Sequence, residues 1–199
     1  MNGRWTISLV VAGSIGYAVI RYIVFGDVPV RQLPLYVANK GAAMSSLLLL
    51  GMSLLARSRE NRKVFGKSGF LLLAAHTVIS IAILTPAYFP KYFHADGTFV
   101  WRVEGGLAFG VAGIVVGVYL FFAAPNGNGS SSLRRGVGRF ILIASAIHTA
   151  LLGYPTWRAI ESWPGYLPPI TLLATISAAV MLALRLAAVR DADASDTPR

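Results

Sequence analysis

The sequence predicts an all-α integral membrane protein, a bundle of six transmembrane helices with both termini on the cytoplasmic side. Hydrophobic residues make up 55% of the chain and charged residues 13%, whereas soluble chains are roughly 25% charged. The hydrophobic residues fall in long blocks, and ~20 mostly apolar helical residues cross a bilayer core of ~30 Å. Lys and Arg concentrate in alternate connections between these blocks.

Six apolar blocks are expected to form the spans, in the order 5–25, 36–56, 68–89, 105–124, 138–156 and 166–189. The first block follows a short segment with Arg4 and is long enough to span, so it is interpreted as a retained helix rather than a cleaved signal peptide. The connections leave no room for a soluble catalytic domain. Residues 1–190 are therefore expected to form one transmembrane domain, with 125–132 as a flexible linker and 191–199 as a disordered cytoplasmic tail.

The formal net charge of +10 is explained by membrane topology. Most Lys and Arg residues lie in the terminal segments and in the 56–67 and 125–139 connections, which six spans place on one side. The positive-inside rule makes that side cytoplasmic, and the opposite connections are rich in aromatic residues typical of the headgroup region. We therefore expect contact with the lipid bilayer of the cell (plasma or inner) membrane, and no nucleic-acid partner.

A repeated pattern in the third and fifth blocks contains two of the three histidines. The copies are Arg62-Lys63, Gly66 and His76, and Arg134-Arg135, Gly138 and His148. The third and fifth helices of a six-span bundle run in the same direction. Each histidine follows its glycine by ten residues, so both imidazoles are expected ~15 Å into the membrane, at a common depth.

Two histidines at one depth suggest a metal site, because polar side chains are costly in hydrocarbon and neutral imidazole binds iron, copper and zinc. The alternative is that each histidine hydrogen-bonds a neighbouring helix. The chain has no cysteine, which excludes iron–sulfur clusters, thiolate zinc sites and covalent c-type haem. No Asp or Glu lies inside a span to complete a non-haem site. Ligand counting therefore favours one b-type haem with His76 and His148 as axial ligands, a coordination suited to electron transfer.

Glycines form a stripe on one face of the fourth helix, and two interpretations remain open. The stripe consists of Gly106, Gly110, Gly113 and Gly117, spaced four, three and four residues apart. Such stripes allow close helix packing, and a bare face could also leave room for a flat macrocycle.

Basic residues near the outer ends of three helices are candidate partners for haem propionates: Arg21, Lys40 and Arg102. Arg21 and Lys40 could instead snorkel to the interface, as long basic side chains do. His94, in an outer loop, is expected to be solvated, and a contact with an electron acceptor or metal ion is the alternative.

These features together resemble the ferric reductase-like transmembrane superfamily, which includes the membrane domains of NADPH oxidases, the STEAP metalloreductases and MsrQ. The resemblance rests on the Arg-Lys or Arg-Arg pair, the glycine and the mid-membrane histidine on the third and fifth helices, and covers roughly residues 36–189. It implies that His76 and His148 are haem ligands. Two-haem members carry a second histidine on each of these helices, so this chain resembles a one-haem form.

The resemblance also implies redox partners on both sides of the membrane. A flavin or quinone at the cytoplasmic side, supplied by a cytoplasmic or membrane reductase, would deliver electrons, and an outer-face acceptor would receive them. The chain lacks a G-x-G-x-x-G fingerprint opening a βαβ unit, so a partner must hold the reductant. The chain would then be the haem subunit of an oxidoreductase. Alternatives are a non-redox scaffold, a transporter subunit or a haem sensor.

Overall fold

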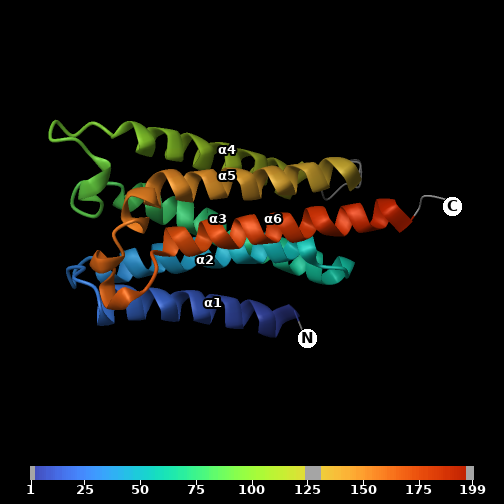
Figure 1. The fold of residues 1–199 in the computed structure, drawn as a ribbon, viewed down its shortest axis with the longest axis horizontal. Coiled ribbons are helices and arrows are strands. Elements are labelled where there is room, and N and C mark those ends of the chain that lie inside the picture. The colour runs from blue at the N-terminus through green and yellow to red at the C-terminus, as the bar shows by residue number, and fades with distance from the viewer. Residues whose placement is uncertain (1–2, 124–130, 196–199) are drawn as a thin grey trace.

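A computed structural model describes residues 3–123 and 131–195, and this part of the chain is helical, without named strands (Figure 1). It contains six helices long and apolar enough to cross a membrane, which confirms the predicted class. The long helices are α1 (Gly3–Val19), α2 (Leu33–Leu55), α3 (Arg59–Ile83), α4 (Trp101–Ala123), α5 (Ser131–Trp157) and α6 (Ile170–Ser195). The short turns are the π-helical η1 (Ile20–Val24), which continues α1, and the 3-10 helices η2 (Pro90–Tyr92), η3 (Ile160–Ser162) and η4 (Pro164–Tyr166).

The two ends of the bundle differ in what they carry. The start of α1, the end of α6 and the α2–α3 connection lie at one end of the bundle; we call this the termini end (Figure 1). The opposite end, the loop end, carries η1, η2, η3 and η4. Helices α3 and α5 therefore run in the same direction, as the repeated pattern required.

Several helices begin or end away from the predicted boundaries. Helix α3 starts at Arg59 instead of residue 68, because the Ser58 side chain accepts a hydrogen bond from the Asn61 N–H at 3.1 Å and caps the helix. It ends at Ile83 instead of 89, shortly before Pro86, which disfavours helical backbone in the residue before it. The apolar blocks mark the lipid-facing length, whereas helical hydrogen bonding follows caps and prolines.

The C-terminal helix also passes its predicted boundary. Helix α6 continues to Ser195, beyond the domain limit expected at residue 190. Residues 124–130, most of the expected linker, and 196–199 of the expected tail lie outside the described residues.

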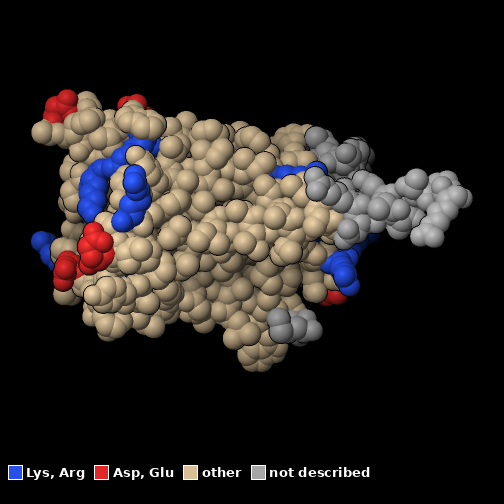
Figure 2. All heavy atoms as spheres, in the orientation of Figure 1, with Lys and Arg blue, Asp and Glu red and all other residues tan. Residues whose placement is uncertain are grey.

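Helix α2 is the centre of the bundle and packs against α1, α3, α5 and α6. One core cluster joins α2, α5 and α6 through Leu47, Leu142, Ala174, Ala178 and Met181. Large hydrophobic side chains elsewhere point outward, for example Leu71, Val78 and Ile81 on α3, which are 61%, 67% and 71% exposed. On the face in Figure 2, charged side chains gather at both ends of the bundle and leave an uncharged belt between them, as lipid contact requires.

Candidate functional site

The histidines of the repeated pattern occupy equivalent places on α3 and α5. His76 and His148 each lie 17 residues after the first residue of their helix (76 − 59 and 148 − 131). The two imidazoles lie within electrostatic range of each other, and both lie within range of the Lys40 ammonium on α2. Helices α3 and α5 are not a closely packed pair; α2 and α4 each pack against both of them. The two histidines thus lie on helices that α2 and α4 connect.

The His76 ring is held by a side chain of α2. Its Nδ1 lies 2.6 Å from Oδ1 of Asn39, which is only 3% exposed. The Ser80 hydroxyl donates to the same amide oxygen at 2.9 Å. An amide oxygen accepts hydrogen bonds and does not donate them, so Nδ1 of His76 carries the proton and Nε2 carries the lone pair.

The His148 ring is held by the backbone of α4. Its Nδ1 donates to the carbonyl oxygen of Gly106 at 2.7 Å, and Nε2 again carries the lone pair. Gly110, one turn further along α4, allows this approach. A Cβ atom at Gly110 would lie 2.8 Å from Nδ1 of His148, closer than real Cβ contacts come.

Both Nε2 atoms are consequently free for a ligand. Within the described ranges neither Nε2 has a hydrogen-bond partner. Neither is a fully buried atom, so both keep some accessible surface. Histidines that bind metals almost always donate their other ring N–H to a carbonyl, carboxylate or water, which fixes the tautomer and raises ligand basicity. His76 and His148 have this arrangement, from two different helices.

Two cations at the loop end of the site lack anionic partners. Arg21, in η1, is 5% exposed, and its Nε and Nη1 have no hydrogen-bond partner in the part of the chain that the structure describes. Its guanidinium lies 5.5 Å from the Tyr22 ring centroid. The Lys40 Nζ lies 5.2 Å from the ring centroids of both Tyr36 and Phe89. Unpaired buried charges are costly, so this arrangement fits an anionic group brought by a ligand.

Arg102 and His94 make contacts within the connection between α3 and α4. Arg102 donates from Nη2 to the backbone oxygen of Lys91 at 2.9 Å, which ties the start of α4 to η2. His94 is exposed in the same connection, where its backbone N–H donates to the oxygen of Thr98 at 2.8 Å.

The glycine stripe of α4 faces two different helices. A Cβ at Gly106 would meet Leu152 of α5 at 3.0 Å, and one at Gly113 would meet Ala144 of α5 at an ordinary 3.7 Å. A Cβ at Gly117 would meet Phe70 of α3 at 3.5 Å. These contacts favour close helix packing for the stripe, with Gly110 alone against the imidazole.

Sequence reasoning missed Asn39 and Ser80. The polar candidates predicted inside the spans are ionisable side chains, and an amide and a hydroxyl are not ionisable. A signal was present, because Asn39 is an amide side chain within the apolar block 36–56. A buried amide in a span requires hydrogen-bond partners on a neighbouring helix.

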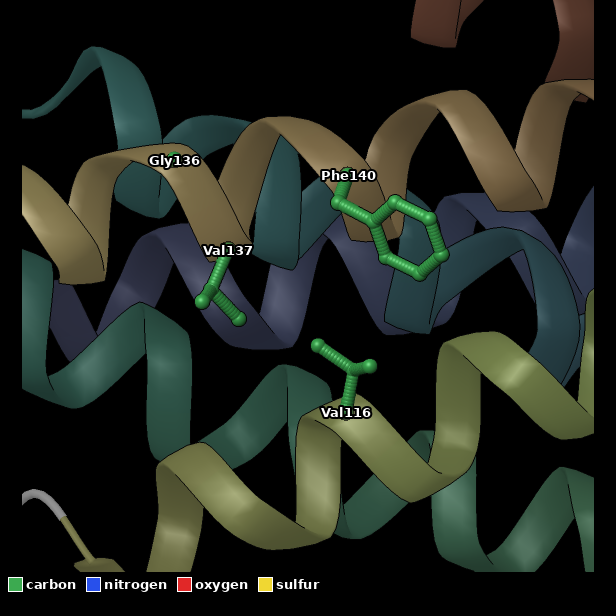
Figure 3. A pocket seen from close by; sticks show the side chains of 4 residues that line it. All are labelled: Val116, Gly136, Val137 and Phe140. Atoms are coloured by element: carbon green, nitrogen blue, oxygen red, sulfur yellow. The ribbon is translucent and has the colours of Figure 1, made fainter.

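An apolar recess between α4 and α5 does not include the histidines. It is lined by Val116, Gly136, Val137 and Phe140 (Figure 3). Phe140 precedes His148 by eight residues, about 12 Å along the helix toward the termini end. The recess has almost no polar lining and fits the hydrocarbon of a lipid.

Comparison with known proteins gives this chain no family. No protein-family model matches it, and no curated protein is significantly similar to it. Among the described residues there is also no group of three or more His, Cys, Asp or Glu side chains that could hold a metal ion. Within the described residues, the site consists of two imidazoles, their hydrogen-bond acceptors and two cations without a carboxylate partner.

Proposed function

We propose that the protein is a b-type haem transmembrane electron-transfer protein in which Nε2 of His76 and Nε2 of His148 would hold one haem. The observation that carries this proposal is that both histidines donate Nδ1–H to an oxygen, at 2.6 and 2.7 Å, and keep Nε2 free. A haem needs only two ligands from the chain, and His76 and His148 each offer a free Nε2. When bound, the haem would supply reversible one-electron chemistry.

Each neighbouring residue has a role that its contacts suggest. Asn39 and the Gly106 carbonyl hold the two ligand tautomers, and Gly110 leaves space for the His148 ring. Arg21 and Lys40 would bind the propionates, because their positive charges lack a partner among the described residues. Arg102 is the weaker candidate, since its Nη2 is engaged by Lys91.

We place the termini end in the cytoplasm, because the basic connections lie there. The histidines lie seven and nine residues from the loop-end termini of α3 and α5 (83 − 76 and 157 − 148). That separation is about 10 and 14 Å of helix, against about 25 Å toward the termini end. Electrons would travel from a cytoplasmic flavin or a membrane quinol toward an acceptor at the loop end. The long inner distance favours a donor that enters the membrane, as in the ferric reductase-like proteins that the chain resembles.

A second candidate function is a non-redox scaffold or transporter subunit. The same hydrogen bonds tie α3 to α2 and α5 to α4, and interhelical bonds of this kind stabilise membrane bundles by about 1 kcal/mol each. This candidate leaves the free Nε2 atoms and the unpaired Arg21 without a purpose.

Absorbance spectroscopy separates these functions. The full chain, purified from a haem-replete host, should show a Soret band and one haem b per chain by the pyridine haemochrome assay. His76→Ala and His148→Ala should lose the band, and His94→Ala, the control, should keep it. A bis-histidine haem should also fail to bind carbon monoxide when reduced, whereas a haem sensor would bind it. Colourless protein, or an equal Soret band in all variants, would refute the proposal.

A further inference from the structure

The two histidines are held by acceptors of different kinds. His148 donates to a backbone carbonyl, which no substitution removes, whereas His76 donates to the side chain of Asn39. Asn39 is 3% exposed, and its oxygen also accepts the Ser80 hydroxyl. Ser80 lies one turn from His76 on α3, and its oxygen is 3.3 Å from Nδ1. The amide oxygen thus receives two donors from α3 and is fixed relative to that helix.

We propose that Asn39 is a positioning residue that holds His76 in the Nδ1–H tautomer and thereby tunes the haem iron. This inference rests on the proposed function for its effect on the iron, although the tautomer itself does not. A hydrogen bond from Nδ1 makes the imidazole a stronger ligand, and loss of such a partner typically weakens metal binding about 10- to 100-fold. Because the acceptor at His76 is a side chain, substitution can change it, whereas the backbone acceptor at His148 cannot be changed in this way.

The direction of the effect follows from the charge of the acceptor. Asn39→Asp places an anionic acceptor on Nδ1–H, gives His76 more imidazolate character, and should favour the ferric iron. Asn39→Leu removes the acceptor at similar volume and should favour the ferrous iron. A tenfold change in the ratio of ferric to ferrous affinity corresponds to about 59 mV for one electron. We expect the midpoint potential to fall in the Asp variant and to rise in the Leu variant.

The first test measures the tautomer without haem. Long-range ¹H–¹⁵N spectra of the haem-free full chain in micelles should show Nδ1–H and an unprotonated Nε2 for His76 and His148. In Asn39→Leu, His76 should lose this single tautomer and His148 should keep it. The control Ser45→Ala changes another buried polar residue of α2, whose hydroxyl has no partner in the described structure, and should alter neither ring. Protonation of His76 at Nε2 in the unmodified chain, or an unchanged His76 tautomer in Asn39→Leu, would overturn the inference.

The second test measures the haem-loaded protein. Asn39→Leu should lose haem to excess apomyoglobin about 10- to 100-fold faster than Ser45→Ala does, and Asn39→Asp should shift the midpoint potential in the opposite direction from Asn39→Leu. Ser80→Ala keeps the Asn39 oxygen but removes the hydroxyl that fixes it, so it should give a smaller shift in midpoint potential than Asn39→Leu. It replaces Asn39→Leu in this test if that variant does not fold. Unchanged potentials in a haem-containing protein would sink the inference and leave the proposed function standing. Colourless protein with an Asn39-dependent His76 tautomer would refute the proposed function and the effect on the iron, and would leave only the positioning of His76 by Asn39.

Discussion

Gly110 and Gly113 of α4 offer a matched pair of substitutions that tests the geometry at His148. A Cβ at Gly110 would lie 2.8 Å from Nδ1 and 3.1 Å from Cε1 of His148, whereas one at Gly113 would lie 3.7 Å from the Ala144 Cβ. To restore an ordinary contact of 3.4 Å, the imidazole must move by 0.6 Å (3.4 − 2.8) away from α4. The bond from Nδ1 to the Gly106 carbonyl, now 2.7 Å, would then approach 3.3 Å and leave the usual range of about 2.7–3.2 Å.

The energetic difference between the two alanine variants follows from these contacts. Gly→Ala in a helix interior stabilises by about 1 kcal/mol in both cases. Gly110→Ala additionally incurs overpacking of about 1–3 kcal/mol and loses a hydrogen bond of about 1 kcal/mol. The Gly110 variant should therefore be less stable than the Gly113 variant by about 2–4 kcal/mol.

The assay compares thermal unfolding and visible spectra of Gly110→Ala and Gly113→Ala in one detergent. Gly110→Ala should unfold at lower temperature, and its Soret band should be diminished or shifted because His148 has lost its acceptor. Gly113→Ala should match the unmodified chain in its spectrum and equal or exceed it in stability. If both variants behave alike, the imidazole does not lie against Gly110 and the reasoning about His148 fails.

Three further predictions concern the cations, the outer aromatic residues and the orientation. Arg21→Met should leave the haem-free chain as stable or more stable, because a buried charge without a carboxylate partner among the described residues is removed. The same variant should release haem faster. A destabilised haem-free chain would show that Arg21 has a structural partner. Burial raises the pKa of Tyr92, in η2, from 10.0 to about 12, so its neutral phenol stabilises the fold below pH 10, and this contribution is lost as the pH rises through about 12. Tyr92→Phe should reduce that alkaline loss of thermal stability; an unchanged alkaline profile would contradict the burial of this phenol. Because the chain has no cysteine, the single-cysteine variants Ala95→Cys and Glu60→Cys report the orientation directly. An impermeant maleimide should label Ala95→Cys on intact cells and Glu60→Cys only after permeabilisation. The opposite result would invert the proposed topology.

The helices and the equivalent positions of His76 and His148 were predictable from the sequence, because hydropathy and spacing are local properties. A span of apolar residues has no alternative in a bilayer but to satisfy its backbone hydrogen bonds as a helix. Equal spacing in two helices of the same direction then gives equivalent positions along those helices. Helix limits were less predictable, since Ser58 and Pro86 act through capping and backbone sterics that hydropathy does not register.

The partners of the histidines could not be predicted in this way, because they depend on how the helices are rotated about their axes. Gly106 accepts from His148 only because α4 presents a bare face to α5, and nothing in the spacing of the stripe indicates which helix it faces. Arg102 is a further example, since its Nη2 donates to the Lys91 carbonyl, a contact that its position at a helix end does not indicate.

Asn39 shows how much of the site depends on such rotation. The amide reaches Nδ1 of His76 and the Ser80 hydroxyl together, because those two residues lie one turn apart on the same face of α3. A turn of α2 by one residue would present Lys40 in place of Asn39, and an ammonium, which only donates, could not hold His76 in the Nδ1–H form. The proposed metal binding by His76 would therefore depend on the packing between α2 and α3, and substitutions in that contact should alter the site without changing either histidine.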